Sequence, residues 1–150
     1  MKLSDLMDVE LVDLDLPAGG TEAVLRCMVE RMHAAGVIGD KEDTLSRLVE
    51  REKVLSTGIG GGIAIPHART PGVTRTVVVL GRSVRGIEFD AVDGKPVEVV
   101  FLILGPSESS AEHVKVLARI ARLVKQPEFH AAVLQAETAE LIMQAVRRHQ

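Results

Sequence analysis

The chain has 150 residues, of which 46% are hydrophobic and 26% charged, so we expect one globular domain over residues 1–150 with a single aliphatic core. Its formal net charge of −3 leaves no basic excess to neutralise phosphates, which argues against a nucleic-acid partner or an anionic membrane surface. The sequence contains neither the apolar run of a signal peptide nor the roughly 18 apolar residues of a membrane span, so we expect a cytoplasmic protein without direct membrane insertion.

The first part of the chain predicts a strand followed by a helix. Apolar residues alternate with aspartates over 12–16, which is typical of a strand with one buried face. From Thr21 the apolar residues follow a helical period, and Gly36 stands where such a helix would end. Cys27, the only cysteine, falls within this helix. A disulfide framework and a thiolate zinc cluster are therefore excluded, and we expect Cys27 in the core.

The middle of the chain predicts a second helix and the central strands. Asp40 can cap the helix with its carboxylate, and Arg51 then falls on the last turn. The near-continuous aliphatic runs 77–80 and 97–104 suit strands that are covered on both faces. Between them, residues 86–89 fit a further short strand.

The last third of the chain predicts helices. Ser109 and Glu112 have the spacing of a capping box, which starts a helix and puts His113 in its first turn. The apolar residues that follow at helical spacing, and turn this histidine inward, are Leu117, Ile120 and Val124. Pro127 and Thr138 mark the starts of two further helices. The inward face of the last helix is expected to consist of Leu141, Ile142, Ala145 and Val146. Strands mixed with helices predict an α/β fold, with a mixed β-sheet of about five strands flanked by helices on both faces in a three-layer sandwich.

The most informative stretch is the glycine-rich segment 58–62 and the residues that follow it. Four of its five residues are glycine, whereas a tight turn needs only one or two. Pro66 fixes its own φ and pushes the preceding residue toward an extended conformation. These restrictions present His67 on a stiff support beside a glycine-lined space. Arg51 and Arg69 are near enough in the sequence to meet an anion there.

Several common chemistries do not fit these residues. A dinucleotide fingerprint starting at Gly58 and Gly60 would need glycine where Ile63 stands, and no Gly-Lys-Ser/Thr of a P-loop follows. No Gly-x-Ser-x-Gly elbow of a serine hydrolase is present either. His67 and His113 could supply two metal ligands, but the spacing indicates no third. Phosphoryl transfer through histidine remains, because a neutral imidazole is a competent nucleophile and the transfer demands mostly positioning and charge stabilisation.

The residues around this histidine resemble a known signature. Residues 51–67 resemble the active-site signature of enzyme IIA domains of the mannitol/fructose type in the bacterial phosphoenolpyruvate-dependent phosphotransferase system. The form Ser-Thr-Gly-Ile-Gly-x-Gly-Ile-Ala-Ile-Pro-His, over 56–67, is most similar to the nitrogen-regulatory branch. The agreement extends to 87–97 and to a His-x-x-x-Leu helix start at His113, and so covers nearly the whole chain. One departure is Ala68, where many relatives carry glycine.

The resemblance implies a cofactor-free phosphocarrier without a metal. His67 would accept a phosphoryl group from the histidine phosphocarrier protein, His113 would be the second active-site histidine, and Arg51 would stabilise the phosphate. The residues expected to support the phosphate pocket are Ser56, Thr57, Gly58, Gly60 and Gly62. The family fold is a mixed sheet flanked by helices. The acceptor would be a separate enzyme IIB specific for a sugar, or a regulatory target protein.

Other hypotheses use the same residues differently. In a regulatory module, phosphorylation of His67 would change which target proteins bind, by adding about two negative charges to a docking surface. In a structural domain with a dead site, His67 would satisfy a local hydrogen bond and His113 would be bonded to backbone inside its helix. Arg51 would then complement the C-terminal dipole of its helix. The histidines interpreted as surface or packing residues are His33, His130 and His149.

Overall fold

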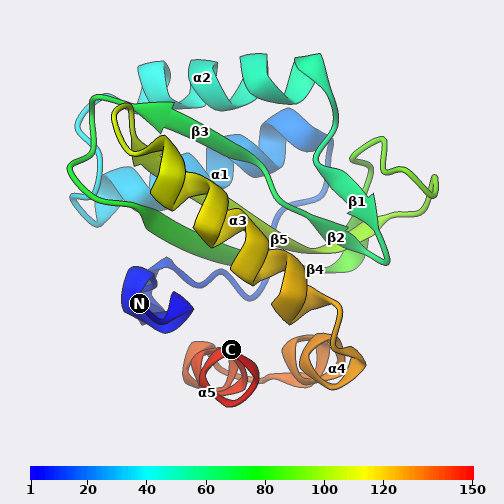
Figure 1. Cartoon of the computed structure of the whole chain (residues 1–150). Helices are drawn as coiled ribbons and strands as arrows, with labels where there is room; N and C mark the ends of the chain where they lie inside the picture. The colour runs from blue at the N-terminus through cyan, green and yellow to red at the C-terminus, as the bar shows by residue number, and fades with distance from the viewer.

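Strand β5 (Val97–Pro106) lies at the centre of a mixed sheet in the computed structural model, which describes residues 1–150 (Figure 1). Along one side it pairs in parallel with β2 (Ile63–Ala64) and β3 (His67–Thr70), and along the other it pairs antiparallel with β4 (Val77–Ile87). Strand β1 (Gly58–Gly60) extends the sheet by pairing antiparallel with β2. Eight of the ten residues of β5 are buried, as expected of a strand covered on both faces.

Strands β2 and β3 lie end to end along the same side of β5. Ile63 of β2 is opposite Val99, and His67 of β3 is opposite Ile103. Pro66 interrupts them, and it has no N–H to add to the ladder. Its carbonyl still accepts a hydrogen bond from the backbone N–H of Ile103 at 2.9 Å. The proline therefore breaks the strand without releasing it from the sheet, and His67 is the first residue after the break.

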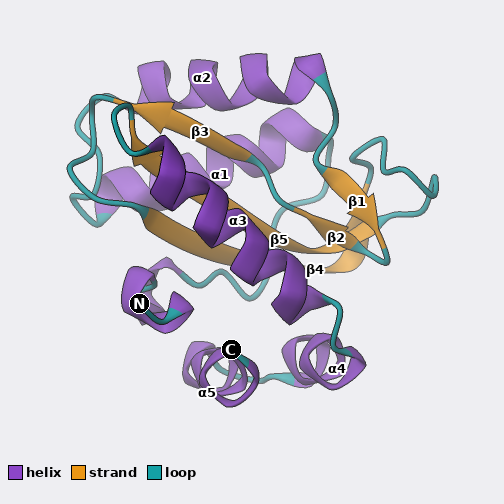
Figure 2. Ribbon diagram, in the orientation of Figure 1, coloured by secondary structure: helices purple, strands orange, loops and turns teal.

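Helices cover both faces of the sheet (Figure 2). On one face lie α1 (Thr21–Ala34) and α2 (Lys41–Val54). On the other lie α3 (Ser110–Val124), α4 (Pro127–Gln135) and α5 (Ala139–His149). Two short 3-10 helices, Leu3–Leu6 and Val9–Leu11, pack beside α5 near the C-terminus. The predicted α/β sandwich with a mixed sheet between helices is confirmed.

Alternate side chains of the central strands enter two separate cores, one on each face of the sheet, rather than the single core expected from the sequence. The core under α1 and α2 receives Val77, Val79, Val100, Leu102 and Leu104. The core under α3, α4 and α5 receives Val78, Leu80, Val99, Phe101 and Ile103. Because the side-chain period of a strand is two, a slip of one residue would exchange these sets, so the pairing register of β4 and β5 is strongly specified.

Most predicted helix boundaries are confirmed. The Asp40 carboxylate accepts a hydrogen bond from Asp43 N at 3.0 Å, and Gly36 adopts φ +76° after the end of α1. Pro127 opens α4 and the Thr138 hydroxyl caps α5. The capping box at Ser109 is an exception, because α3 starts where expected but the serine side chain makes no capping hydrogen bond.

The strand predicted at 12–16 is wrong. The segment makes only one bridge to the edge of the sheet, between Asp13 and Gly81. The Asp13 side chain is buried rather than exposed, because its carboxylate accepts hydrogen bonds from Asp15 N at 2.9 Å and from the half-buried thiol of Cys27 at 3.5 Å. Backbone hydrogen bonds still join the segment to β4, from Asp13 N to Leu80 O, from Arg82 N to Asp13 O and from Leu16 N to Arg82 O, but they form one isolated bridge and no ladder.

Other differences concern the faces and ends of elements. Residues 86–87 are not a separate strand but the end of β4, which follows a register shift after Arg82. In α5, Leu141 is 45% exposed and Met143 is buried in its place. The inner face of α3 is formed by His113, Val116, Ile120 and Leu123. No helix is both long and apolar enough to cross a membrane.

Candidate active site

An open pocket of about 570 Å³ lies where the last turns of α2, the start of β3 and the start of α3 meet. Its titratable and charged lining residues are Arg47, Glu50, Arg51, His67, Arg69 and His113. The structure therefore brings together the two histidines and the arginine that the sequence singles out, although they come from three separate elements.

The His67 ring is held by the backbone just before it. Its Nδ1 lies 2.8 Å from the carbonyl oxygen of Ile65. A carbonyl can only accept a hydrogen bond, so Nδ1 carries the proton. Burial lowers the pKa of His67, the Ile65 contact raises it, and the positive charge of Arg51 lowers it, with a net shift downward. At neutral pH the ring is therefore uncharged, and Nε2 carries the free lone pair.

His113 lies against His67 from the first turn of α3. The two ring centroids are 5.3 Å apart and the rings are inclined by 53°. The side chain of His113 is buried, and burial is the largest cause that lowers its pKa to about 4, followed by the charges of His67 and Arg69. Both rings are neutral at pH 7, which avoids repulsion between them.

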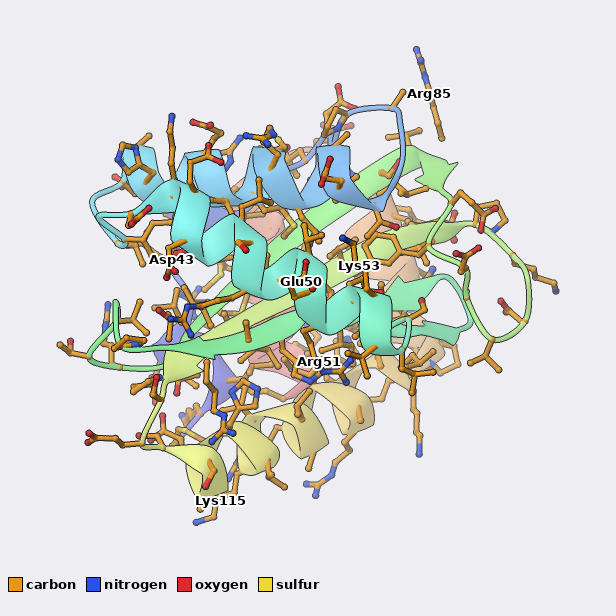
Figure 3. All side chains as sticks on the ribbon, turned by 90° about the horizontal axis from the view of Figure 1, so that it is seen from above. Asp43, Glu50, Arg51, Lys53, Arg85 and Lys115 are labelled. Carbon is orange, nitrogen blue, oxygen red and sulfur yellow. The ribbon has the colours of Figure 1, made fainter.

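Two of the pocket arginines have no carboxylate partner. Arg47 forms an ion pair with Asp43 at 2.8 Å, but Arg51 and Arg69 belong to no ion pair. The Arg51 Nη1 donates to the carbonyl of Leu55 at 3.1 Å, which holds the guanidinium at the end of its helix. Figure 3 shows Arg51 on the side of α2 that faces α3. Because a guanidinium has five N–H donors, this anchoring leaves donors for an anion.

The five residues expected to support a phosphate pocket do not line it. The list comprises Ser56, Thr57, Gly58, Gly60 and Gly62. The three glycines build the β1–β2 hairpin instead, where Gly60 and Gly62 have φ of +94° and +81°. Glycine is required at these two positions because side chains rarely tolerate such angles. Ser56 donates from its hydroxyl to the carbonyl of Phe89 and so ties the start of the hairpin to the neighbouring loop.

Thr57 does not line the pocket but connects α2 to the backbone that holds the His67 ring. Its backbone N–H and its hydroxyl donate to the two carboxylate oxygens of Glu52 at 2.8 and 2.7 Å. Its carbonyl accepts from the N–H of Ile65 at 3.1 Å, and Ile65 in turn accepts from the His67 ring. A continuous chain of hydrogen bonds therefore runs from α2 to the imidazole. This role of Glu52 was not predicted, since the only signal for it in the sequence is its place beside Arg51 in the resembling motif.

The remaining titratable residues do not add to the pocket. No group of three or more His, Cys, Asp or Glu side chains is arranged to hold a metal ion. His130 lies 3.3 Å from Glu98, and His149 lies 3.3 Å from Gln126, both outside the pocket. The pocket thus combines two neutral imidazoles with unpaired guanidinium groups, which suits an anion and a nucleophilic nitrogen.

Comparison with known proteins agrees with this arrangement. The model of the family described as phosphoenolpyruvate-dependent sugar phosphotransferase system, EIIA 2, matches residues 5–149. The chain belongs to this family. It is 33% identical over 140 residues to the fructose-specific EIIA component of Haloferax volcanii, covering 93% of this chain and 91% of that protein. It is also 33% identical over 143 residues to a nitrogen regulatory protein of Bradyrhizobium diazoefficiens, covering 95% and 92%.

The fold agrees as well. The crystal structure of the nitrogen regulatory protein IIA-Ntr from Neisseria meningitidis superimposes with a TM-score of 0.89 at 28% identity, covering 96% of this chain and 98% of that one. The recognised resemblance to the enzyme IIA family, including its nitrogen-regulatory branch, is confirmed.

Loss of the Glu52 carboxylate should destabilise the protein. Glu52→Ala removes two hydrogen bonds to a charged acceptor, so we expect the free energy of unfolding to fall by about 2 kcal/mol in urea titrations. Glu50→Ala is the matched control on the same helix, because it removes only an exposed ion pair with Lys53 and should change stability by less than about 0.5 kcal/mol. Equal effects of the two variants would contradict the support through Thr57.

The buried neutral state of His113 should make stability depend on pH. The unfolded chain takes up this proton near pH 6.5, whereas the folded chain takes it up only near its pKa of about 4. Stability from this residue is therefore complete above pH 6.5 and is lost as the pH falls toward 4. Urea unfolding of the parent and of His113→Gln across this range should show the steeper loss in the parent. Parallel curves would contradict the lowered pKa.

Proposed function

We propose that this protein is a phosphocarrier of the phosphotransferase system, in which His67 Nε2 accepts a phosphoryl group from the histidine phosphocarrier protein. The observation that carries the proposal is the hydrogen bond between Nδ1 and the Ile65 carbonyl. It places the ring proton on Nδ1, so Nε2 of the neutral ring that lines the pocket keeps a free lone pair. The group is then passed to a separate enzyme IIB or held as a signal. Exchange with a cytoplasmic donor implies that the protein acts in the cytoplasm.

The transfer exchanges one phosphorus–nitrogen bond for another. The lone pair on His67 Nε2 attacks the phosphorus of the donor's phosphohistidine, and the bond to the donor ring breaks as the electron pair returns to that ring's nitrogen. The proton on His67 Nδ1 stays in place throughout. Its hydrogen bond to the Ile65 carbonyl strengthens when substitution at Nε2 makes the ring positive, so the support also stabilises the product.

Cationic and N–H groups around the ring stabilise the transferred group. A phosphoryl group brings about two negative charges into the pocket. Arg51 and Arg69 are free of carboxylates and offer guanidinium donors, while His113 offers a ring N–H from the side of α3. Hydrogen bonds of this charge-assisted kind are about twice as strong as neutral ones, so we assign phosphate stabilisation to these three side chains.

A regulatory role of the same site is the second candidate. It is favoured by the 33% identity to a nitrogen regulatory protein, which equals the identity to the fructose-specific component. Both functions use His67, and they differ in the fate of the phosphoryl group. Transport requires rapid donation to the cysteine of an enzyme IIB, whereas regulation requires a phosphorylated state that persists and alters binding to a target protein.

Substitution of His67 tests the shared step. The donor is the histidine phosphocarrier protein phosphorylated with radioactive phosphate. The parent should be labelled and His67→Ala should not, because alanine has no nucleophilic nitrogen. His130→Ala is the matched control, since this histidine lies outside the pocket and should leave labelling unchanged. Persistent labelling of His67→Ala would end the proposal. Adding purified enzyme IIB to the labelled parent then separates the two roles, because rapid loss of label rules out a purely regulatory one.

Substitution of Arg51 tests the phosphate-stabilising role. We expect Arg51→Lys to slow labelling by about tenfold, because an ammonium cannot keep the Leu55 carbonyl and offer a planar pair of donors to phosphate at the same time. Arg47→Lys is the matched control, since Arg47 is already paired with Asp43. Quench-flow labelling measures both variants, and equal rates for Arg51→Lys and the parent would count against this role.

A further inference from the structure

Two buried polar side-chain atoms of the protein have no hydrogen-bond partner, the Oγ1 of Thr76 and the Nδ1 of His113. Thr76 is only 1% exposed and His113 only 7%. Buried polar groups in native proteins are nearly always hydrogen-bonded, because an unsatisfied one costs the full free energy of its desolvation. Both of these atoms lie near the proposed transfer site, which points to a function for them in the transfer.

Both atoms face the same point of the central strand. A β-carbon on Gly105 would lie 3.0 Å from His113 Nδ1 and 3.6 Å from Thr76 Oγ1. Thr76 directly precedes β4, whose first residue Val77 is opposite Leu104, so the threonine lies beside Gly105 in the antiparallel register. Glycine at 105 leaves the space between the hydroxyl and the ring free of side-chain atoms.

The proton on the His113 ring decides what the ring can offer a phosphate. A neutral imidazole carries one proton, on either Nδ1 or Nε2. Nδ1 is the nitrogen beside Gly105, so the other nitrogen serves the pocket that His113 shares with His67. With the proton on Nε2 the ring donates to a phosphoryl oxygen. With the proton on Nδ1 it presents a lone pair to an anion, which is repulsive.

We propose that Thr76 is a positioning residue of the transfer site, whose hydroxyl donates to His113 Nδ1 and so keeps the ring proton on Nε2 for the phosphoryl group. This inference rests on the proposed function of His67. A hydroxyl both donates and accepts, so Thr76 also serves as acceptor if the ring gains a second proton when phosphate arrives. A small turn of the hydroxyl and the ring into the space beside Gly105 satisfies both orphaned atoms at once.

Histidine-ring nitrogen-15 NMR of the unphosphorylated protein tests the tautomer. In the parent, His113 should carry its proton on Nε2. Thr76→Val replaces the hydroxyl by a methyl of similar shape, so we expect the Nδ1–H form to become populated. Thr76→Ser keeps the hydroxyl and should restore the parent spectrum, which a purely structural role of the threonine methyl would not do.

Phosphoryl transfer supplies the second measurement. We expect Thr76→Val to slow labelling of His67 by about five- to tenfold, the effect of one neutral hydrogen bond, with Thr76→Ser close to the parent. An Nδ1–H tautomer in the parent overturns the proposal even if no variant folds. Unchanged tautomer and rate in Thr76→Val overturn it as well. If the parent takes no phosphate, the proposed function fails, while the NMR comparison still decides the role of Thr76.

Discussion

The hydrogen bond between the His67 ring and the Ile65 carbonyl is the contact on which the proposed chemistry depends. The backbone of Ile65 faces away from β5, because its N–H donates to the Thr57 carbonyl, whereas the next carbonyl, that of Pro66, accepts from Ile103 of β5. The Thr57 N–H in turn donates to Glu52 of α2. Local backbone stiffness and a tertiary hydrogen-bond chain thus combine to fix one proton on one nitrogen.

The proposed chemistry also requires both imidazole rings to be uncharged, and burial provides this. Both histidines have lowered pKa values mainly because they are removed from water, and positive charges nearby lower them further. A protonated His67 would have no lone pair for attack, so the cost of desolvating the charged ring is useful to the proposed reaction. Arg51 and Arg69 act in the same direction, since the charges that attract phosphate also disfavour imidazolium.

The sequence predicted what depends on local pattern. Aliphatic runs predicted β4 and β5, helical spacing turned His113 inward, and the Pro66 break pointed to His67. It failed where tertiary contacts decide the outcome. The segment 12–16 alternates like a strand, but it makes only one isolated bridge to β4, and its Asp13 carboxylate is buried, where it accepts from Asp15 N and from the Cys27 thiol.

The sequence also failed at the glycines that were expected to support a phosphate pocket. A run of glycines indicates unusual dihedral angles, but it does not indicate which residues lie beside them. Gly60 and Gly62 use those angles to close the β1–β2 hairpin. At Gly105 the reason for glycine is the space that His113 and Thr76 share, since a β-carbon there would lie 3.0 Å from the His113 ring. That proximity arises only when β4 and α3 pack against β5, so no sequence pattern could predict it.

The surroundings of the pocket explain how one proposed site can serve either a transport or a regulatory partner. Phosphorylation of His67 would add about two negative charges to a chain whose formal net charge is −3, beside two unpaired arginines. Val114, which lines the pocket, is 64% exposed, and Leu55, which anchors Arg51, is 69% exposed. A partner that packs on these apolar residues would therefore meet the change in charge directly. Under the proposed function, side chains around the pocket would select that partner, while the chemistry within the pocket would be the same for either one.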